Sequence, residues 1–261
     1  MSCCPPDSLP YLASDYNHSG AVVEFSHYSS SPSSSSGAAA YVSGADSERG
    51  LIVVPDIYGW NGGRTRNIAD WFAKAGYLVA VPKILDPALN GGTDGDGCPP
   101  DYKPDATFMP WMQTYSWAES FKPKIAATRD YLVSRGVKKI VMIGFCFGGL
   151  VVAKTLVDPD LGDIFVGGAS PHPSIQLEQF AYGGSIEDLC AAVTKPMLIL
   201  PASSDSPDYD KGGKWCGAGW ESIRFPDMFH GWVPRGDVND PKQAEAIIAA
   251  LEHMSTFFAK L

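Results

Sequence analysis

The sequence predicts an α/β fold with a mostly parallel central sheet and helices on both faces. Continuous apolar runs without alternation, such as residues 51–55, are typical of strands that are buried on both sides. Segments with apolar residues at helical spacing follow most of these runs, so strands and helices alternate along the chain. Of the 261 residues, 45% are hydrophobic and 19% are charged, which is enough for a full core and excludes global disorder.

The first half of the chain contains four expected strands and one helix. The strands are residues 21–26, 38–43, 51–55 and 77–81. Between the first two lies the Ser-rich stretch 29–36, which cannot pack and predicts a flexible hairpin tip. The helix, residues 64–74, is predicted because Ile68, Trp71 and Phe72 recur at helical spacing.

The second half contains the remaining expected elements. The strands are residues 139–143, 164–169, 197–202 and 221–225, and the helices are residues 118–134, 147–157 and 240–258. The last helix has the clearest signal, because Asp240 is suited to cap it and Pro241 to occupy its first position. Its apolar face comprises Ala244, Ile247, Ile248, Leu251, Met254, Phe257 and Phe258.

We expect one domain, residues 21–261, preceded by a Pro- and Ser-rich N-terminal arm, residues 1–20. The chain shows no internal repeat and no linker. Residues 86–117 lack periodicity and are rich in Gly and Pro. They also carry an aromatic cluster, which predicts a packed cap rather than a tail.

The net charge and the cysteine content limit the kinds of partner that this protein is expected to bind. With 20 Lys+Arg against 29 Asp+Glu, the net charge of −9 argues against nucleic acid and anionic membranes, and we expect a small-molecule partner. No run of 18 apolar residues predicts a membrane span. Six cysteines without CxxC spacing predict neither a disulfide scaffold nor a metal site. The beginning lacks signal-peptide features, so we expect a cytoplasmic protein.

A Gly-Phe-Cys-Phe-Gly-Gly motif at residues 144–149 directly follows an expected strand and opens an expected helix. This is the setting of a nucleophile elbow, in which small residues such as Gly144 and Gly148 permit a sharp, strained turn. The helix N-terminus favours the Cys146 thiolate, and the N–H of Phe147 can face an oxyanion. The alternative is that Cys146 is a small buried core residue.

The order of residues along the chain favours the catalytic interpretation. Asp205 follows the next-to-last expected strand, and His230 follows the last one, as a hydrolase triad requires after the nucleophile Cys146. Asp208 is an alternative acid, because the path of this loop does not follow from the sequence. His172 lies at the end of another strand and could line the pocket.

The elbow, the downstream Asp and the Phe-His-Gly-Trp segment at residues 229–232 resemble the dienelactone hydrolase (carboxymethylenebutenolidase) family, over residues 20–261. The resemblance implies an α/β-hydrolase fold that cleaves carboxylic esters or lactones through an acyl-thioester, without a cofactor. It implies that Cys146 is the nucleophile, His230 the base and then the acid, and Asp205 the residue that orients the His.

The Asp-Ile-Tyr-Gly sequence at residues 56–59 resembles the family's Glu-Ile-Phe-Gly-like motif. By this resemblance Asp56 modulates the thiol, and the N–H of Ile57 is the second oxyanion donor beside that of Phe147. Because Asp is one methylene shorter than the family's Glu, we expect a different route of thiol activation.

The family's bacterial members hold a substrate carboxylate with arginines, but residues 86–117 contain none. Arg235 could supply such a contact, or it could pair with Asp237 at the surface. The aromatic cap predicts a more apolar acyl or leaving group. The expected substrate contacts are Tyr58, Trp111, Tyr115, Trp232 and Arg235.

The sequence leaves two other functions and the oligomeric state open. The fold could be a catalytically weak binding or interaction protein. Cys146 could instead be a redox sensor with Cys98, Cys190 or Cys216 as the resolving thiol. We expect a monomer or a homodimer.

Overall fold

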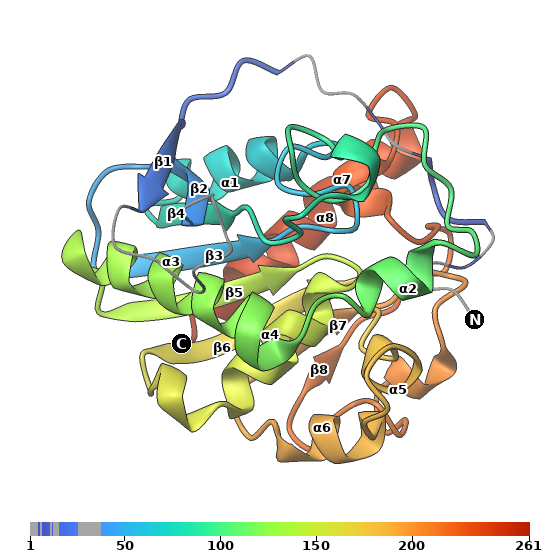
Figure 1. The fold of residues 1–261 in the computed structure, drawn as a ribbon. Helices are drawn as coiled ribbons and strands as arrows, with labels where there is room; N and C mark the ends of the chain where they lie inside the picture. Colours follow the sequence, from blue (N-terminus) through green and yellow to red (C-terminus); the bar gives the residue numbers. More distant parts are fainter. Residues whose placement is uncertain (1–4, 6, 11, 13–15, 26–37) are drawn as a thin grey trace.

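The computed structural model describes residues 5, 7–10, 12, 16–25 and 38–261. Its strands form one eight-stranded sheet in the order β1-β2-β4-β3-β5-β6-β7-β8 (Figure 1). The strands are β1 (Ala21–Phe25), β2 (Ala38–Ser43), β3 (Arg49–Val54), β4 (Leu78–Pro82), β5 (Lys139–Gly144), β6 (Phe165–Pro171), β7 (Met197–Leu200) and β8 (Glu221–Ser222). Strand β2 is antiparallel to β1 and β4, and the other pairs are parallel.

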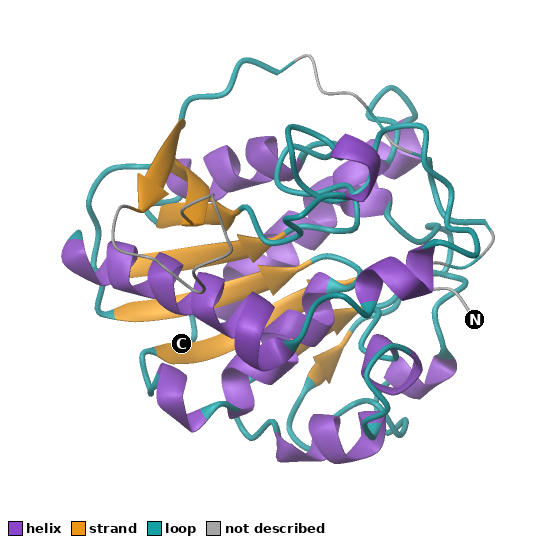
Figure 2. Cartoon of the chain, viewed as in Figure 1, coloured by secondary structure: helices purple, strands orange, loops and turns teal. Residues whose placement is uncertain are grey.

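Helices cover both faces of the sheet, as expected (Figure 2). They are α1 (Thr65–Lys74), α2 (Phe108–Met112), α3 (Lys122–Ser134), α4 (Gly148–Val157), α5 (Leu177–Phe180), α6 (Ile186–Ala192), α7 (Trp232–Arg235) and α8 (Pro241–Phe258). Within the described ranges, no helix combines the length and apolar character needed to cross a membrane.

The alternation of strand side chains divides the core into two layers. Leu51 and Val53 of β3 pack on the face covered by α1 and α8, whereas Ile52 and Val54 pack on the face covered by α3 and α4. Both sets are fully buried, which explains why the strand reads as a continuous apolar run.

The expected strands are confirmed to within a few residues, with one shortening. Residues 221–225 are predicted as a strand, but β8 ends at Ser222, and only an isolated bridge joins Ala202 to Phe225. Arg224, which lies between Ser222 and Phe225 in the chain, donates from its guanidinium to the backbone carbonyls of Asp205 and Ser206 at 3.2 and 2.9 Å. The backbone hydrogen bonds nevertheless continue past Ser222, because the N–H groups of Ile223 and Phe225 donate to the carbonyls of Ile199 and Pro201 at 3.0 and 2.8 Å.

The helix expected over residues 118–134 is divided into two parts. A π-helical turn, Trp117–Phe121, precedes α3, because Pro123 lacks the N–H needed for an uninterrupted ladder. Helices α2, α5, α6 and α7 were not expected, since elements of four to seven residues are too short to show helical periodicity. The Ser-rich stretch lies outside the described residues.

The segment over residues 86–117 packs through a chain of aromatic rings that leads to the elbow. Ring centroids are 5.5 Å apart for Trp111–Tyr115, 5.5 Å for Tyr115–Phe121 and 6.1 Å for Phe121–Phe147. Phe147 directly follows Cys146, so the aromatic cluster packs next to the candidate nucleophile.

Candidate active site

Cys146 lies on the sharp turn between β5 and α4, with a φ of 54°. Such a left-handed conformation is strained for a residue with a side chain, and it is common where a structure holds a functional group. The turn depends on Gly144, because a Cβ there would lie 2.2 Å from the Gly148 carbonyl oxygen. The sharp turn expected between this strand and helix is therefore present.

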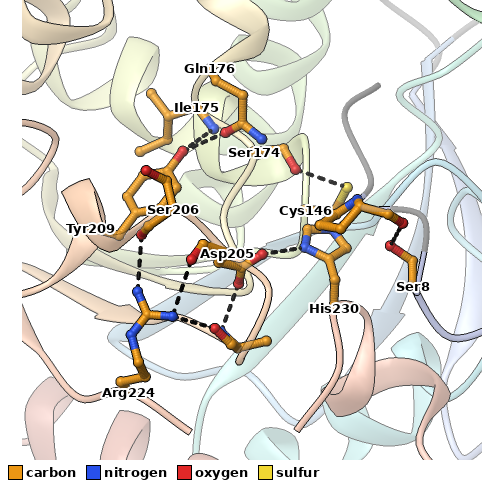
Figure 3. A network of polar contacts seen from close by, with 12 residues as sticks. Ser8, Cys146, Ser174, Ile175, Gln176, Asp205, Ser206, Tyr209, Arg224 and His230 are labelled. Atoms are coloured by element: carbon orange, nitrogen blue, oxygen red, sulfur yellow. Dashed lines mark hydrogen bonds and ion pairs between the residues drawn. The ribbon is translucent and has the colours of Figure 1, made fainter. Parts of the chain in front are cut away.

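The structure brings His230 and Asp205 together beside Cys146 (Figure 3). His230 Nδ1 lies 2.7 Å from Asp205 Oδ1, and both side chains are buried. The other oxygen, Oδ2, accepts the Ala202 N–H at 2.7 Å, which fixes the carboxylate. The Asp208 side chain instead contacts Ser206 Oγ at 3.3 Å within its own turn. Asp205, rather than Asp208, is thus the acid in contact with the histidine.

The environment of His230 favours its charged form. Burial alone lowers the pKa of the imidazole, but the charge of Asp205, the neighbouring Cys146 and the contact of Nδ1 with Asp205 outweigh burial and raise the pKa well above its usual value. His230 is therefore suited to hold a proton at this edge of the sheet.

Ser174 is a site residue that the sequence analysis missed. Its Oγ lies 3.3 Å from Cys146 Sγ, and its backbone N–H donates to the Cys146 carbonyl at 2.9 Å. The only available signal was its place shortly after β6, where chain segments reach the carboxyl edge of a parallel sheet. His172, which was expected to line the pocket, has a φ of 39° and packs 4.9 Å from the His230 ring.

Asp56 and Arg235 form a buried ion pair, with both side chains 1% exposed. The alternative in which Arg235 lies at the surface and pairs with Asp237 is therefore wrong, because its guanidinium is buried against Asp56. Asp56 Oδ1 also accepts the Tyr58 N–H at 2.9 Å, and the guanidinium lies 5.0 Å from the Tyr58 ring centroid.

Part of the N-terminal arm packs against the same loop. The Leu9 N–H donates to the His230 carbonyl at 3.0 Å, and the Leu9 carbonyl accepts from Arg235 Nε at 3.0 Å. In Figure 3, Ser8 lies on the other side of Cys146 from Ser174. The arm therefore packs against the segment that carries His230 and Arg235.

The two expected oxyanion donors come from neighbouring segments. The Phe145 N–H donates to the Val54 carbonyl at 3.1 Å, which places the elbow beside the end of β3, where Ile57 follows. In the described part of the chain, no backbone carbonyl accepts from the N–H of Phe147 or Ile57.

The expected substrate contacts occupy different environments. The Tyr58 hydroxyl donates to the Tyr102 carbonyl at 3.0 Å, and Trp111 and Tyr115 both donate to the Pro87 carbonyl. Trp232 is fully buried in the core and packs 4.4 Å from the Phe225 ring centroid, which is the position of a structural residue.

The sequence is similar to several known hydrolases. It is 29% identical over 200 residues to a carboxymethylenebutenolidase homolog of Mus musculus, covering 75% of this chain and 76% of that protein. It is 26% identical over 216 residues to the hydrolase pyvD of Aspergillus violaceofuscus, covering 80% and 79%. A Rattus norvegicus carboxymethylenebutenolidase homolog is 32% identical over 152 residues, 57% of this chain, and the match spans only 54% of that relative.

Solved structures and a family model complete the comparison. The esterase Est1E of Butyrivibrio proteoclasticus with bound ferulic acid superposes with a TM-score of 0.60 at 15% identity, over 85% of this chain and 96% of that one. This likeness shows the α/β-hydrolase fold alone. The model of the dienelactone hydrolase family matches residues 38–261, which include every element from β2 to α8. The chain belongs to the dienelactone hydrolase family.

Proposed function

We propose that this protein is a cysteine-dependent hydrolase of carboxylic ester or lactone bonds. The observation that carries the proposal is the placement of Cys146 on a strained elbow beside the His230–Asp205 pair. Nucleophile, base and orienting acid are the three parts that covalent acyl transfer requires. Family membership supports the same reaction class.

In the first step the Cys146 thiolate attacks the carbonyl carbon of the substrate, its proton having passed to His230. The new S–C bond moves an electron pair onto the carbonyl oxygen. The N–H groups of Phe147 and Ile57 stabilise this oxyanion, each contributing about 3 kcal/mol as in related sites. The electron pair then returns, and the C–O bond breaks as His230 protonates the leaving oxygen.

In the second step the acyl-thioester is hydrolysed. His230, now neutral, takes a proton from water, and the resulting hydroxide equivalent attacks the thioester carbonyl. The S–C bond breaks, which releases the carboxylic acid and restores the thiolate. Asp205 keeps the imidazole in the required tautomer and stabilises its charged form.

The surroundings support a substrate with an apolar group. A cavity of about 270 Å³ lies between the end of the aromatic segment and α4. Its lining residues are Ser116, Trp117, Phe121, Leu150, Val151, Lys154 and Tyr182. Phe121 connects this cavity to the elbow only through its ring contact with Phe147, at 6.1 Å between centroids, because Cys146 does not line the cavity.

The redox alternative receives less support from the structure. Burial raises the pKa of Cys190 to about 12 and also raises the pKa of Cys216. A resolving thiol reacts as its thiolate, and both groups are therefore poorly suited to that role.

The test is hydrolysis of p-nitrophenyl acetate and of a dienelactone. We expect turnover by the native enzyme, and its loss after iodoacetamide treatment or in Cys146→Ala. Cys216→Ala is the matched control, since it removes a half-buried thiol and is expected to leave both turnover and inactivation unchanged. Turnover that survives Cys146→Ala would contradict the proposal, and tight binding without turnover would favour a binding protein.

A further inference from the structure

The Cys146 sulfur lies against a neutral hydroxyl as well as against the imidazole. Ser174 Oγ is 3.3 Å from Sγ, within the hydrogen-bond range for sulfur, and both residues are fully buried. In Figure 3 the Ser174 side chain points at the sulfur from the side opposite Ser8. Ser174 therefore touches the atom that would react.

The backbone around Ser174 fixes the position of this hydroxyl. Its N–H donates to the Cys146 carbonyl at 2.9 Å, which ties the segment after β6 to the elbow itself. The next N–H, that of Ile175, donates to the Tyr209 hydroxyl at 2.9 Å, and Tyr209 donates to Gln176 Oε1 at 2.6 Å. These bonds hold the Ser174 backbone beside the elbow, which keeps its Oγ within reach of the sulfur.

A hydroxyl in this position acts differently on the two forms of the thiol. Toward a thiolate the hydroxyl can only donate, and that hydrogen bond is charge-assisted. Toward the neutral thiol the contact is a weak S–H interaction. A hydrogen bond that is stronger for the charged form favours that form.

The carboxylate that the family resemblance assigns to thiol control is already engaged. Asp56 Oδ2 pairs with Arg235, and Asp56 Oδ1 accepts the Tyr58 N–H. This pairing neutralises the carboxylate charge near the elbow. The charged groups around the sulfur are thus the His230–Asp205 pair and the Asp56–Arg235 pair, whereas Ser174 is an uncharged donor in direct contact.

We propose that Ser174 stabilises the Cys146 thiolate by donating a hydrogen bond from Oγ to Sγ, and so takes over part of the thiol activation in this protein. The inference rests on the proposed role of Cys146 as nucleophile. It predicts that the hydroxyl, rather than the serine's packing, sets the reactivity of the thiol.

The experiment measures the rate of Cys146 alkylation by iodoacetamide against pH, without substrate, with the Cys146 peptide quantified by mass spectrometry. In Ser174→Ala we expect the apparent pKa of the thiol to rise by about one unit, and kcat/KM near pH 7 to fall about 10-fold. Ser170→Ala is the matched control, because Ser170 is equally buried and its Oγ donates to the Gly144 carbonyl at 2.8 Å. We expect Ser170→Ala to leave the thiol pKa unchanged.

An unchanged alkylation profile in Ser174→Ala would overturn the inference, as would an equal rise in Ser170→Ala. A shift in Asp56→Asn without one in Ser174→Ala would assign thiol control to the carboxylate instead. Ser174→Gly also removes the hydroxyl and provides the same comparison if Ser174→Ala does not fold. Since alkylation needs no turnover, these outcomes are separate from survival of activity in Cys146→Ala, which would contradict the proposed function itself.

Discussion

Two buried acid–base pairs lie at the carboxyl edge of the sheet, and they differ in one chemical property. Asp205 follows β7 and meets His230, whereas Asp56 follows β3 and meets Arg235. Both bases come from the segment after β8, five residues apart, at opposite ends of the short α7. Histidine can exchange a proton near neutral pH, but arginine does not titrate in this range.

Because of this difference, the first pair is suited to transfer a proton, whereas the second is suited to hold segments of the chain together. The Asp205–His230 pair adjoins the sulfur and is suited to move its proton. The Asp56–Arg235 pair has an arginine in place of the histidine, and Arg235 also holds the arm, because its Nε donates to the Leu9 carbonyl. The two pairs therefore predict different consequences of mutation: loss of turnover for the first, and loss of stability for the second.

The largest effect is expected from removal of the histidine. His230→Gln should lower kcat for p-nitrophenyl acetate by about 10⁴-fold, because no group remains to take and return the proton. His253→Gln, which changes an exposed histidine on α8, should retain wild-type turnover. A His230→Gln enzyme with near-normal kcat would show that the first pair does not transfer protons.

The acid of the first pair is expected to matter somewhat less. Asp205→Asn should lower kcat about 1,000-fold, since the amide no longer stabilises the imidazolium or its tautomer. Asp208→Asn should remain near the wild type, because Asp208 contacts Ser206 within its own turn. The reverse pattern in steady-state kinetics would identify Asp208 as the functional acid.

The second pair should affect stability. Arg235→Met leaves the Asp56 carboxylate buried without its counter-charge, and we expect the free energy of unfolding in urea to fall by about 3 kcal/mol. The double variant, Asp56→Leu with Arg235→Met, should recover most of this loss, because it buries no charge. Failure of the double variant to recover stability would show that the pair does more than balance charge.

The smallest difference is expected in the pH dependence of stability. Folding raises the pKa of His230 above its unfolded value of about 6.5. The pair with Asp205 therefore contributes its full stability below about pH 6.5. This contribution is lost as the pH rises through the folded pKa. The loss of unfolding free energy in Asp205→Asn should therefore shrink as the pH rises from about 6.5 through the raised folded pKa of His230. The loss in Arg235→Met should not shrink as the pH rises, because the unpaired buried Asp56 carboxyl is costly in its ionised form. A parallel decrease of the loss in the two variants would remove the distinction.

The sequence by itself determined the sheet, the elbow and the order of the triad. Strands such as β3 are recognisable because burial on both faces demands a continuous apolar run, and Gly144 is required by the turn itself, since a Cβ there would meet the Gly148 carbonyl. These features can be recognised from short stretches of sequence. The order of Cys146, Asp205 and His230 could be read because each follows a strand that ends at the same edge.

Only the tertiary structure decided which side chains meet at that edge. Arg235 and Asp56 are 179 residues apart, and Ser174 is 28 residues from Cys146, so no local pattern records either contact. The choice of Asp205 over Asp208 and the core position of Trp232 likewise depend on the paths of loops after the strands. Loop paths are set by packing between distant segments, because local propensity leaves irregular backbone with many conformations of similar free energy.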